Sequence, residues 1–512
     1  MGVATTGSTT GQGPLRSILV LGGGTAGWLA ASILARALPG TGIRITVVES
    51  PDIGTVGVGE ATIPPILDLL KFLSIDEADF CRHTKATYKL GIRFTDWLRT
   101  GHRYWHPFGT FGATINRRPF FHAWQRAVAA GDRPRFTDFS LTARIAEENR
   151  FRRAEPGGAA AGLRYALHFD AGLVAQYLAA YATRLGVERV AATVRGATRA
   201  ADGGVEALTL EDGTTRSADL YIDCSGFRGV LIEQTLGTGY IDWQRWLPCD
   251  RAVALPTGIT RPRPPYTEAS ARSAGWRWRI PLVHRTGNGY VYSSAHVSDE
   301  AALADLFGEV GSKPEAEPRV LRFTAGRRRL AWNRNVIAVG LASGFLEPLE
   351  STSIHLAASS VYHLLEHFPD RGFAQGTIDS YNAAMVDEIE RIRDFIVLHY
   401  CLTERDDSDF WRDCRTTEPP ASLAERIALY RETGRVRPRA GELFTDLSWF
   451  YILDGMGIRP ERHDPLIDVV PPAQFADILR RLAAETDAAA RSSVPHDSLF
   501  DAAEPRPAKA TS

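Results

Sequence analysis

Three glycines near the start of the chain have the spacing of a dinucleotide-binding turn. Gly22, Gly24 and Gly27 form a G-x-G-x-x-G pattern between an apolar run of strand length and a helical pattern. Glycine at these positions allows a tight turn and lets backbone N–H groups approach a pyrophosphate at the helix N-terminus. Glu49 ends the next β-branched run, where its carboxylate can accept hydrogen bonds from a ribose. This order of strand, turn, helix and acidic strand end predicts a dinucleotide site rather than a plain turn.

The rest of the sheet favours FAD over NAD as the dinucleotide. Glycine-bearing strand ends recur far downstream, in 219–229 (DLYIDCSGFRG) and 335–352 (NVIAVGLASGFLEPLEST). A fold needs such ends to enclose a long, extended flavin. Only one clear G-x-G-x-x-G occurs, so we find no second Rossmann domain for NAD(P)H. Reduced flavin, or electrons, must then come from elsewhere.

The elements that position these residues form an α/β core. Residues 17–50 read as a βαβ unit at the head of a parallel sheet. Residues 168–186 have helical spacing and end at Gly186, a predicted C-cap. Residues 187–222 are expected to form a small antiparallel meander that returns to the main sheet, and 318–347 return to sheet character.

Helical patterns dominate from residue 354 onward. The fold class is therefore α/β, a Rossmann-like FAD-binding core with antiparallel sheet insertions and a helical C-terminal region. We expect the core at 15–375, with insertions for the substrate region, and the helical region at 376–490. Residues 1–14 and 491–512 are expected to be disordered tails.

Bulk composition excludes several functions. Lys and Arg number 59 against 60 Asp and Glu, so nothing favours nucleic acid or an anionic membrane as partner. Five cysteines without C-x-x-C spacing argue against a disulfide framework or a zinc site and favour a reducing cytoplasm. No secretory signal is evident, and no run of about 18 apolar residues exists. We expect a cytoplasmic protein with no metal.

Several segments together resemble the flavin-dependent halogenases of the tryptophan halogenase family. The segments are GGGTAGW (22–28), GVGEATIP (57–64), ATYKLGIRF (86–94), WRWRIP (276–281), PLEST (348–352) and RDFIVLHY (393–400). GGGTAGW alone indicates only a flavoprotein, whereas WRWRIP together with PLEST and YKLGI is specific. The resemblance covers about residues 15–490 and implies a core of the flavin monooxygenase and halogenase type.

The resemblance also implies a reaction. Reduced FAD, supplied by a separate flavin reductase, reacts with oxygen to give a hydroperoxide, and chloride or bromide attacks its distal oxygen. Hypohalous acid then moves through an internal tunnel to a lysine, which holds it beside a small aromatic substrate, and a glutamate assists the substitution. The lysine falls at Lys89 and the glutamate at Glu350.

Physical chemistry is consistent with both roles. Lys89 lies in an alternating apolar segment, and burial favours the neutral amine, which can bind or be chlorinated by hypohalous acid. Arginine, which supplies most other positive charge, stays protonated and cannot replace it. Glu350 can stabilise a cationic ring and accept its proton. The alternatives are a structural or snorkelling lysine and a carboxylate in a capping region, with Ser351 or Thr352 as the cap.

Neighbouring positions receive implied roles as well. Backbone N–H groups of Thr352 and Ser353, at a helix start, form an anion nest for the halide. Members that act on free tryptophan typically have Gly where this chain has Ser353, so the halide preference stays open. Trp276 and Trp278, together with Ser351, fill the approach to the flavin and leave a passage only for small species. The alternative for the two tryptophans is an alternating strand with core-facing indoles.

The flavin-binding positions implied by the resemblance come from six segments. They are Gly22, Gly24, Thr25, Ala26, Gly27, Glu49, Ala61, Val194, Leu341 and Ile354.

The substrate region departs from enzymes for free tryptophan. His106 and Phe108 match the segment that encloses an aromatic ring, although His106 alone could be an ordinary histidine. Phe450 and Tyr451, in SWFYILDGMGIRP (448–460), are candidate aromatic walls, but no carboxylate clamp for an amino-acid ammonium is evident. We therefore expect an indole, a phenol-like compound or a larger modified product.

Two other functions stay open on the sequence alone. One is a flavin-dependent aromatic hydroxylase or related oxidoreductase, against which WRWRIP argues. The other is a non-catalytic flavoprotein. Similar proteins are often dimers, so a homodimer is a further expectation by analogy.

Overall fold

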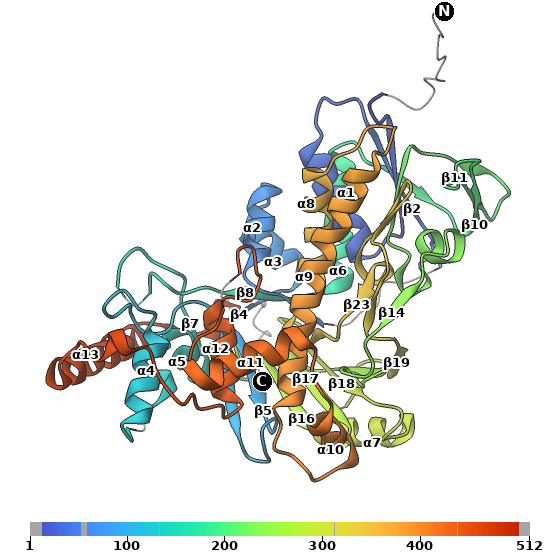
Figure 1. Cartoon of the computed structure of the whole chain (residues 1–512). Helices are drawn as coiled ribbons and strands as arrows, with labels where there is room; N and C mark the ends of the chain where they lie inside the picture. Colours follow the sequence, from blue (N-terminus) through green and yellow to red (C-terminus); the bar gives the residue numbers. More distant parts are fainter. Residues whose placement is uncertain are drawn as a thin grey trace, which may run out of the picture.

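A computed structural model describes residues 13–52, 59–132, 134–158, 160–311, 313–437 and 439–500 (Figure 1). Most of the predicted N-terminal tail, 1–14, lies outside the described residues, as do Gly57 and Val58 of the GVGEATIP segment.

The predicted βαβ unit is confirmed at the centre of a mostly parallel sheet. In spatial order its strands are β21 (Trp332–Asn333), β22 (Val336–Ala338), β13 (Leu220–Asp223), β1 (Ser17–Leu21), β2 (Arg44–Glu49) and β9 (Glu188–Ala191). Only the β21–β22 pair of this sheet is antiparallel among the described strands. Because β13 and β22 lie on one side of β1, both downstream glycine segments meet the turn of Gly22 at the carboxyl edge, as predicted.

Both faces of this sheet are covered, which explains why β1 is a continuous apolar run. Ile18 and Val20 pack with the helices α1 (Thr25–Ala37), α6 (Ala171–Arg184) and α8 (Ser353–Glu366). Leu19 and Leu21 pack on the other face with the sheet formed by β10 (Val194–Arg199), β11 (Val205–Leu210) and β12 (Thr215–Arg216). The antiparallel meander is therefore confirmed, and β13 is its return to the main sheet.

Two local expectations were wrong. Residues 166–170 form strand β8 (Ala166–Asp170), and the helix begins only at Ala171, where the Asp170 side chain caps it. Strand β8 pairs with β3 (Gly59–Ala61) and β4 (Thr87–Lys89), and these long-range hydrogen bonds override the helical spacing. The start of the predicted meander, Glu188–Ala191, is strand β9 of the main sheet instead, and the meander begins at β10.

A second large sheet carries the tryptophan motif. Its order is β19 (Arg319–Arg322), β15 (Arg251–Thr257), β18 (Thr286–Tyr292), β17 (Gly275–Pro281), β16 (Thr267–Arg272), β5 (Gly91–Thr95) and β6 (Arg103–Pro107). On β17 the side chains of Trp276, Trp278 and Ile280 are buried, while the intervening arginines are partly exposed. The alternating strand that the sequence indicated is confirmed.

Helices complete the fold around the two large sheets. One of them, α9 (Gln375–Cys401), packs in both the half that contains the parallel sheet and the half that contains the C-terminal helices. The C-terminal helices are α9 (Gln375–Cys401), α10 (Asp409–Thr416), α11 (Ala421–Thr433), α12 (Asp446–Gly455) and α13 (Pro472–Arg491). The remaining ones are α2 (Pro65–Phe72), α3 (Glu77–Thr84), α4 (Phe120–Ala129), α5 (Leu141–Glu147) and α7 (Asp299–Val310). Helix α9 contacts α8 and β21 in one half and α10, α11 and α12 in the other (Figure 1). Within the described ranges, every helix is too short or too polar to cross a bilayer.

The predicted disordered tail 491–512 is wrong for its first part. Strand β24 (Val494–Pro495) pairs with β7 (Arg150–Phe151), and His496 is fully buried. Asp497 forms an ion pair with Arg263 at 2.9 Å, and the rings of His496 and Phe500 lie 6.3 and 6.1 Å from Tyr88. These contacts fix the segment directly behind the strand that carries Lys89. Residues 501–512 lie outside the described part.

We expect truncation after Arg491 to destabilise the protein, because it removes the β24 pairing, the buried His496 and the Asp497 partner. The loss of these contacts is worth on the order of 2–4 kcal/mol, which should lower the melting temperature by several degrees. The control chain ends at Phe500. Equal melting temperatures for the two chains would show that residues 492–500 do not contribute to the stability of the fold.

Candidate active site

The glycine turn after β1 fits a bound pyrophosphate. Gly22 has φ +116°, and a Cβ there would lie 2.4 Å from the carbonyl oxygen of Cys224. A Cβ on Gly27 would lie 1.9 Å from the carbonyl oxygen of Gly22. Gly24, at the N-cap of α1, faces open space instead, so a ligand can approach the backbone there. Gly22 and Gly27 thus allow close backbone packing within the turn, whereas the backbone at Gly24 is accessible to a ligand.

Glu49 lies at the end of β2, as predicted, and its carboxylate already holds two protein donors. Trp28 Nε1 donates to Oε2 at 3.0 Å, and Arg189 Nε donates to Oε1 at 2.5 Å. These contacts orient the carboxylate and leave further lone pairs for a ribose hydroxyl.

The other predicted flavin contacts come from separate segments. Thr25 and Ala26 begin α1, and a Cβ on Gly340 would lie 2.8 Å from Cβ of Ala26, so the loop with Leu341 lies against this helix start. Leu341 is 36% exposed, unusual for a leucine and suited to contact with a ligand. The remaining positions are Ala61 on β3, Val194 at the start of β10 and Ile354 in the first turn of α8.

Lys89 is completely buried on β4. Its Nζ donates to the carbonyl oxygen of Thr62 at 2.9 Å and to Oγ of Ser351 at 2.8 Å, and lies 5.3 Å from the ring centre of Phe108. Burial lowers the pKa of Lys89 to about 7, while the charge of Glu350 acts in the opposite direction. A large fraction of this amine is therefore neutral near pH 7.

Glu350 is also fully buried, between two histidines. His106 Nδ1 lies 2.7 Å from Oε2, and His399 Nε2 lies 3.0 Å from Oε1. Burial opposes ionisation of this carboxyl, but His106 and His399 outweigh it and lower the pKa of Glu350 to about 2. Lys89 and Glu350 therefore lie at the same site. Lys89 donates to Ser351, and Ser351 is the residue directly after Glu350.

Ser351 has the strained backbone of this segment. Its φ is +60°, in the left-handed region, and the residue is 4% exposed. The proposed capping role is wrong for both candidates: the Ser351 hydroxyl accepts from Lys89, and Thr352, the N-cap of α8, makes no capping bond with its side chain within the described residues. The first N–H groups of α8, at Thr352 and Ser353, are therefore not capped by that hydroxyl.

Sequence reasoning missed His399 as a site residue. It lies on α9, its ring stacks on Phe94 at 4.6 Å, and its Nδ1 lies 2.8 Å from the Tyr104 hydroxyl. Burial lowers the pKa of His399. His399 lies in RDFIVLHY (393–400), one of the segments that resemble the family, and its presence there was the sequence feature that could have identified it.

The two motif tryptophans lie next to each other. Trp276 and Trp278 are buried with ring centres 6.2 Å apart, and Trp276 Nε1 donates to Oε2 of Glu347 at 2.5 Å. Gly289, on the neighbouring strand β18, makes room for Trp278, because a Cβ there would lie 2.0 Å from the indole. Both indoles are thus held firmly.

The substrate side differs in part from the prediction. His106 and Phe108 are in place, but the His106 ring is anchored on Glu350, and Phe108 lies beside Lys89. Tyr451 lies 6.1 Å from His106 between ring centres. The ring of Phe450 is fully buried, stacks on Phe121 of α4 at 5.2 Å and lies 5.8 Å from the ring of Tyr451. Its role as a substrate wall stays a prediction.

Two further aromatic residues near His106 were missed. Phe395 and Phe444 stack at 3.8 Å and lie 5.5 and 5.9 Å from the imidazole. Together with Phe108 and Tyr451 they surround the His106–Glu350 pair with aromatic surface. The buried hydroxyl of Tyr451 has no hydrogen-bond partner in the described part of the chain.

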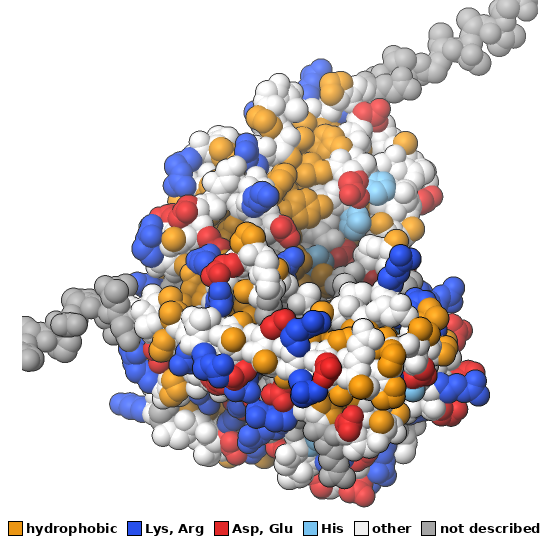
Figure 2. All heavy atoms as spheres, turned by 90° about the vertical axis from the view of Figure 1, so that its left-hand side faces the viewer, with side chains coloured by type: hydrophobic (Ala, Val, Ile, Leu, Met, Phe, Trp, Pro, Cys, Tyr) orange, Lys and Arg blue, Asp and Glu red, His pale blue; other side chains and the backbone are white. Residues whose placement is uncertain are grey.

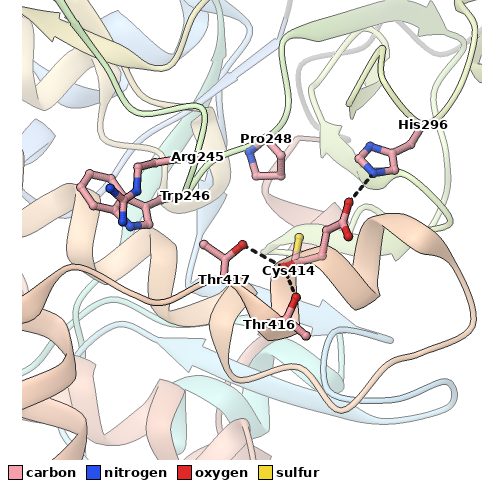
Figure 3. A pocket seen from close by; sticks show the side chains of 8 residues that line it. Arg245, Trp246, Pro248, His296, Cys414, Thr416 and Thr417 are labelled. Atoms are coloured by element: carbon pink, nitrogen blue, oxygen red, sulfur yellow. Dashed lines mark hydrogen bonds and ion pairs between the residues drawn. The ribbon is translucent and has the colours of Figure 1, made fainter.

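A hollow on one face and a separate pocket beside α10 are two concave features of the molecular surface. Figure 2 shows one face with a central hollow, apolar side chains in its upper wall and charged side chains around it. A separate pocket of about 330 Å³ lies beside α10, lined by Trp246, His296 and Cys414 among others (Figure 3). There His296 pairs with Asp413 at 3.1 Å, and burial raises the pKa of the Cys414 thiol, so these groups offer no reactive chemistry.

The Lys89→Met variant should be more stable than the wild type, because it removes a buried amine that resists charging. The folded pKa, about 7, is below the ordinary 10.5, so the penalty is complete below pH 7 and disappears as pH rises towards 10.5. We expect the melting temperature to rise by on the order of 2–5 °C at pH 6.5 and by less at pH 9.5. Lys71→Met, at an exposed lysine, is the control. A destabilised Lys89→Met protein at pH 6.5 would contradict the lowered pKa.

Comparison with known proteins gives one consistent result. The family model described as tryptophan halogenase matches residues 17–472. Tryptophan 6-halogenase SttH of Streptomyces toxytricini is 36% identical over 489 residues, covering 89% of this chain and 92% of that protein. Tryptophan 7-halogenase RebH of Lentzea aerocolonigenes is 33% identical, covering 90% and 93%.

Solved structures agree with this similarity. BrvH, a flavin-dependent halogenase from Brevundimonas sp. BAL3, superposes with a TM-score of 0.92 at 44% identity over 96% of this chain and 99% of that one. Xcc4156, a flavin-dependent halogenase from Xanthomonas campestris, also gives a TM-score of 0.92, at 42% identity over 97% and 99%.

Proposed function

From the premise that this chain belongs to the tryptophan halogenase family, we propose that it halogenates an electron-rich, indole-like aromatic ring with Lys89 and Glu350 at the reaction site. The chain is accordingly an enzyme, a flavin-dependent halogenase. The observation that carries the proposal is the buried pair itself: an amine with a pKa of about 7 beside a carboxylate with a pKa of about 2.

The residues of the nucleotide site fit FAD. The turn of Gly22, Gly24 and Gly27 receives the pyrophosphate, and Glu49 receives the ribose. Bound reduced FAD, provided by a separate flavin reductase, supplies hypohalous acid from oxygen and a halide. The N–H groups at Thr352 and Ser353 offer the halide a helix N-terminus.

Lys89 holds the oxidised halogen beside the ring. Its amine is oriented by the carbonyl of Thr62 and the hydroxyl of Ser351. Because burial keeps a large fraction neutral near pH 7, the amine has a lone pair available to bind hypohalous acid or to be halogenated. Phe108 lies alongside and keeps water away.

Glu350 acts on the ring rather than on the halogen. Its pKa of about 2 keeps it ionised at every working pH, so its negative charge stabilises the positive charge that develops on the attacked ring. A protonated aromatic carbon is a far stronger acid than a carboxylic acid, so even this weak base accepts the ring proton. His106 and His399 hold the carboxylate in position.

We expect brominated indole when the protein is incubated with indole, FAD, a flavin reductase, NADH and bromide, with the isotope doublet detected by mass spectrometry. Lys89→Ala should lose at least 100-fold of this product, in line with removal of a group that handles the reacting atom, while flavin oxidation continues. Lys85→Ala, at an exposed lysine, is the matched control. Bound FAD with no halogenated product from a broad aromatic panel would refute the proposal.

Both acids of helix α12 already accept hydrogen bonds from protein groups. Asp454 of α12 accepts from Trp124 Nε1 at 3.1 Å and from Arg459 at 2.8 Å, and Asp446 accepts from the backbone N–H of Leu447. Aromatic surface and the unpartnered hydroxyl of Tyr451 are what this side presents instead. These features favour an indole or phenol-like ring over free tryptophan.

Indole should therefore be a better substrate than L-tryptophan, with kcat/KM higher by at least tenfold, about 1.4 kcal/mol of transition-state binding. The measurement compares initial rates for the two compounds under equal flavin supply. 3-Methylindole has a substituent at C3 but no charge. Its kcat/KM therefore distinguishes the effect of substrate size from the effect of the charged amino-acid group of L-tryptophan. Equal kcat/KM values for indole and L-tryptophan would mean that a clamp for the ammonium exists.

A further inference from the structure

A second buried carboxylate lies three residues before Glu350. Glu347 is 1% exposed, and its Oε2 accepts from Trp276 Nε1 at 2.5 Å and from the Tyr400 hydroxyl at 2.6 Å. Its other oxygen, Oε1, has no hydrogen-bond partner among the described residues. Glu347 has no part in the halogenation step proposed for Lys89 and Glu350.

Helix α9 holds both carboxylates with consecutive side chains. His399 contacts Glu350, and Tyr400 donates to Glu347. A single short 3-10 turn, Pro348–Glu350, connects the two acids. A displacement of Glu347 would therefore move Glu350 as well.

Aromatic rings tie this arrangement to the motif tryptophan. The indole of Trp97 lies 6.3 Å from that of Trp276, 5.2 Å from the Tyr400 ring and 5.8 Å from the His399 ring. Trp97 Nε1 itself donates to the carbonyl of Ala269 on β16. The rings of Trp276, Trp97, His399 and Tyr400 thus pack in an unbroken series from β17 to α9. Because they are closely packed, the orientation of each ring constrains that of its neighbour.

Packing alone does not explain an acid at this position. Burial raises the pKa of Glu347 to about 7, partly offset by its two donors, which shows how unfavourable the charge is there. The other titratable groups that face it are the thiols of Cys249 and Cys414, and neither supplies a positive charge. An apolar side chain of similar volume would leave the buried Trp276 N–H and the Tyr400 hydroxyl without an acceptor, so this position needs an acceptor oxygen.

We propose that Glu347 is a positioning residue that fixes the Trp276 indole in the approach to the flavin and holds the segment of Glu350 in register with α9. The proposal rests on the halogenase function given above. If Trp276 loses its acceptor, the indole can rotate and no longer fills that approach. Hypohalous acid then escapes to solvent, and less of it reaches the ring.

The test compares Glu347→Leu with Glu347→Gln by the amount of halogenated indole formed per flavin oxidised. The glutamine carbonyl can accept both bonds, so Glu347→Gln should stay within twofold of the wild type. Glu347→Leu should lose at least fivefold of this ratio, and free hypohalous acid should appear, detected by halogenation of monochlorodimedone in solution.

Asp454→Leu is the matched control. It removes another acid that accepts from an indole N–H, that of Trp124, at a partly buried position, and its ratio should not change. Thermal melts and FAD titration of each variant establish that it is folded. An unchanged ratio in folded Glu347→Leu would overturn the proposal, as would an equal loss in Asp454→Leu.

A crystal structure of flavin-free Glu347→Leu gives a second readout that does not need turnover. We expect the Trp276 ring to be rotated or disordered relative to the wild type, and an unmoved ring would count against the positioning role. If the wild type forms no halogenated product, the proposed function fails, while the ring position still decides the role of Glu347. If Glu347→Leu does not fold, Tyr400→Phe replaces it: a two- to threefold loss is expected, and no loss overturns the proposal.

Discussion

The removal of an amine from water is the constraint on which the rest of the site depends. Lys89 has no exposed surface, and its nitrogen is held by a carbonyl and a hydroxyl. Desolvation brings its pKa to about 7, into the range where the amine has a free lone pair. The neighbours of Lys89 are Thr62 directly after β3, the paired strand β8, the ring of Phe108 and Ser351.

Two glutamates three residues apart show how environment sets the state of one functional group. Glu350 has imidazole nitrogens beside both oxygens, and its pKa falls to about 2. Glu347 has only an indole and a phenol as donors, and burial raises its pKa to about 7. Both sets of neighbours include α9, through His399 and Tyr400. Helix α9, which contacts both halves of the fold, thus also influences the protonation of these two glutamates.

The aromatic surroundings of Glu350 are the basis for proposing an aromatic substrate without an ammonium group. Phe108, Phe395, Phe444 and Tyr451 lie around the histidine–glutamate pair, and the acids of α12 already have partners. The named tryptophan halogenases share a third of the sequence, whereas the two flavin-dependent halogenases from Brevundimonas and Xanthomonas share more than two fifths. The family match over residues 17–472 shows a flavin-dependent halogenase, and the aromatic residues of α9 and α12 near Glu350 are the basis for the substrate proposed above.

The sequence by itself determined the features that are local or that repeat with a short period. The glycine turn with Glu49, the βαβ unit, the meander and the alternation of WRWRIP depend on backbone conformation and on which face of a strand is buried, and each is visible in a few residues. The family segments placed Lys89 and Glu350, which the fold brings together. Tertiary structure decided the rest. Hydrogen bonds from β3 and β4 made residues 166–170 a strand, and contacts with Arg263 and Tyr88 ordered the segment after Arg491. Only the packing of α9 against the PLEST turn paired Glu350 with His399 and Glu347 with Trp276, because residues so distant along the chain leave no pattern in either segment alone.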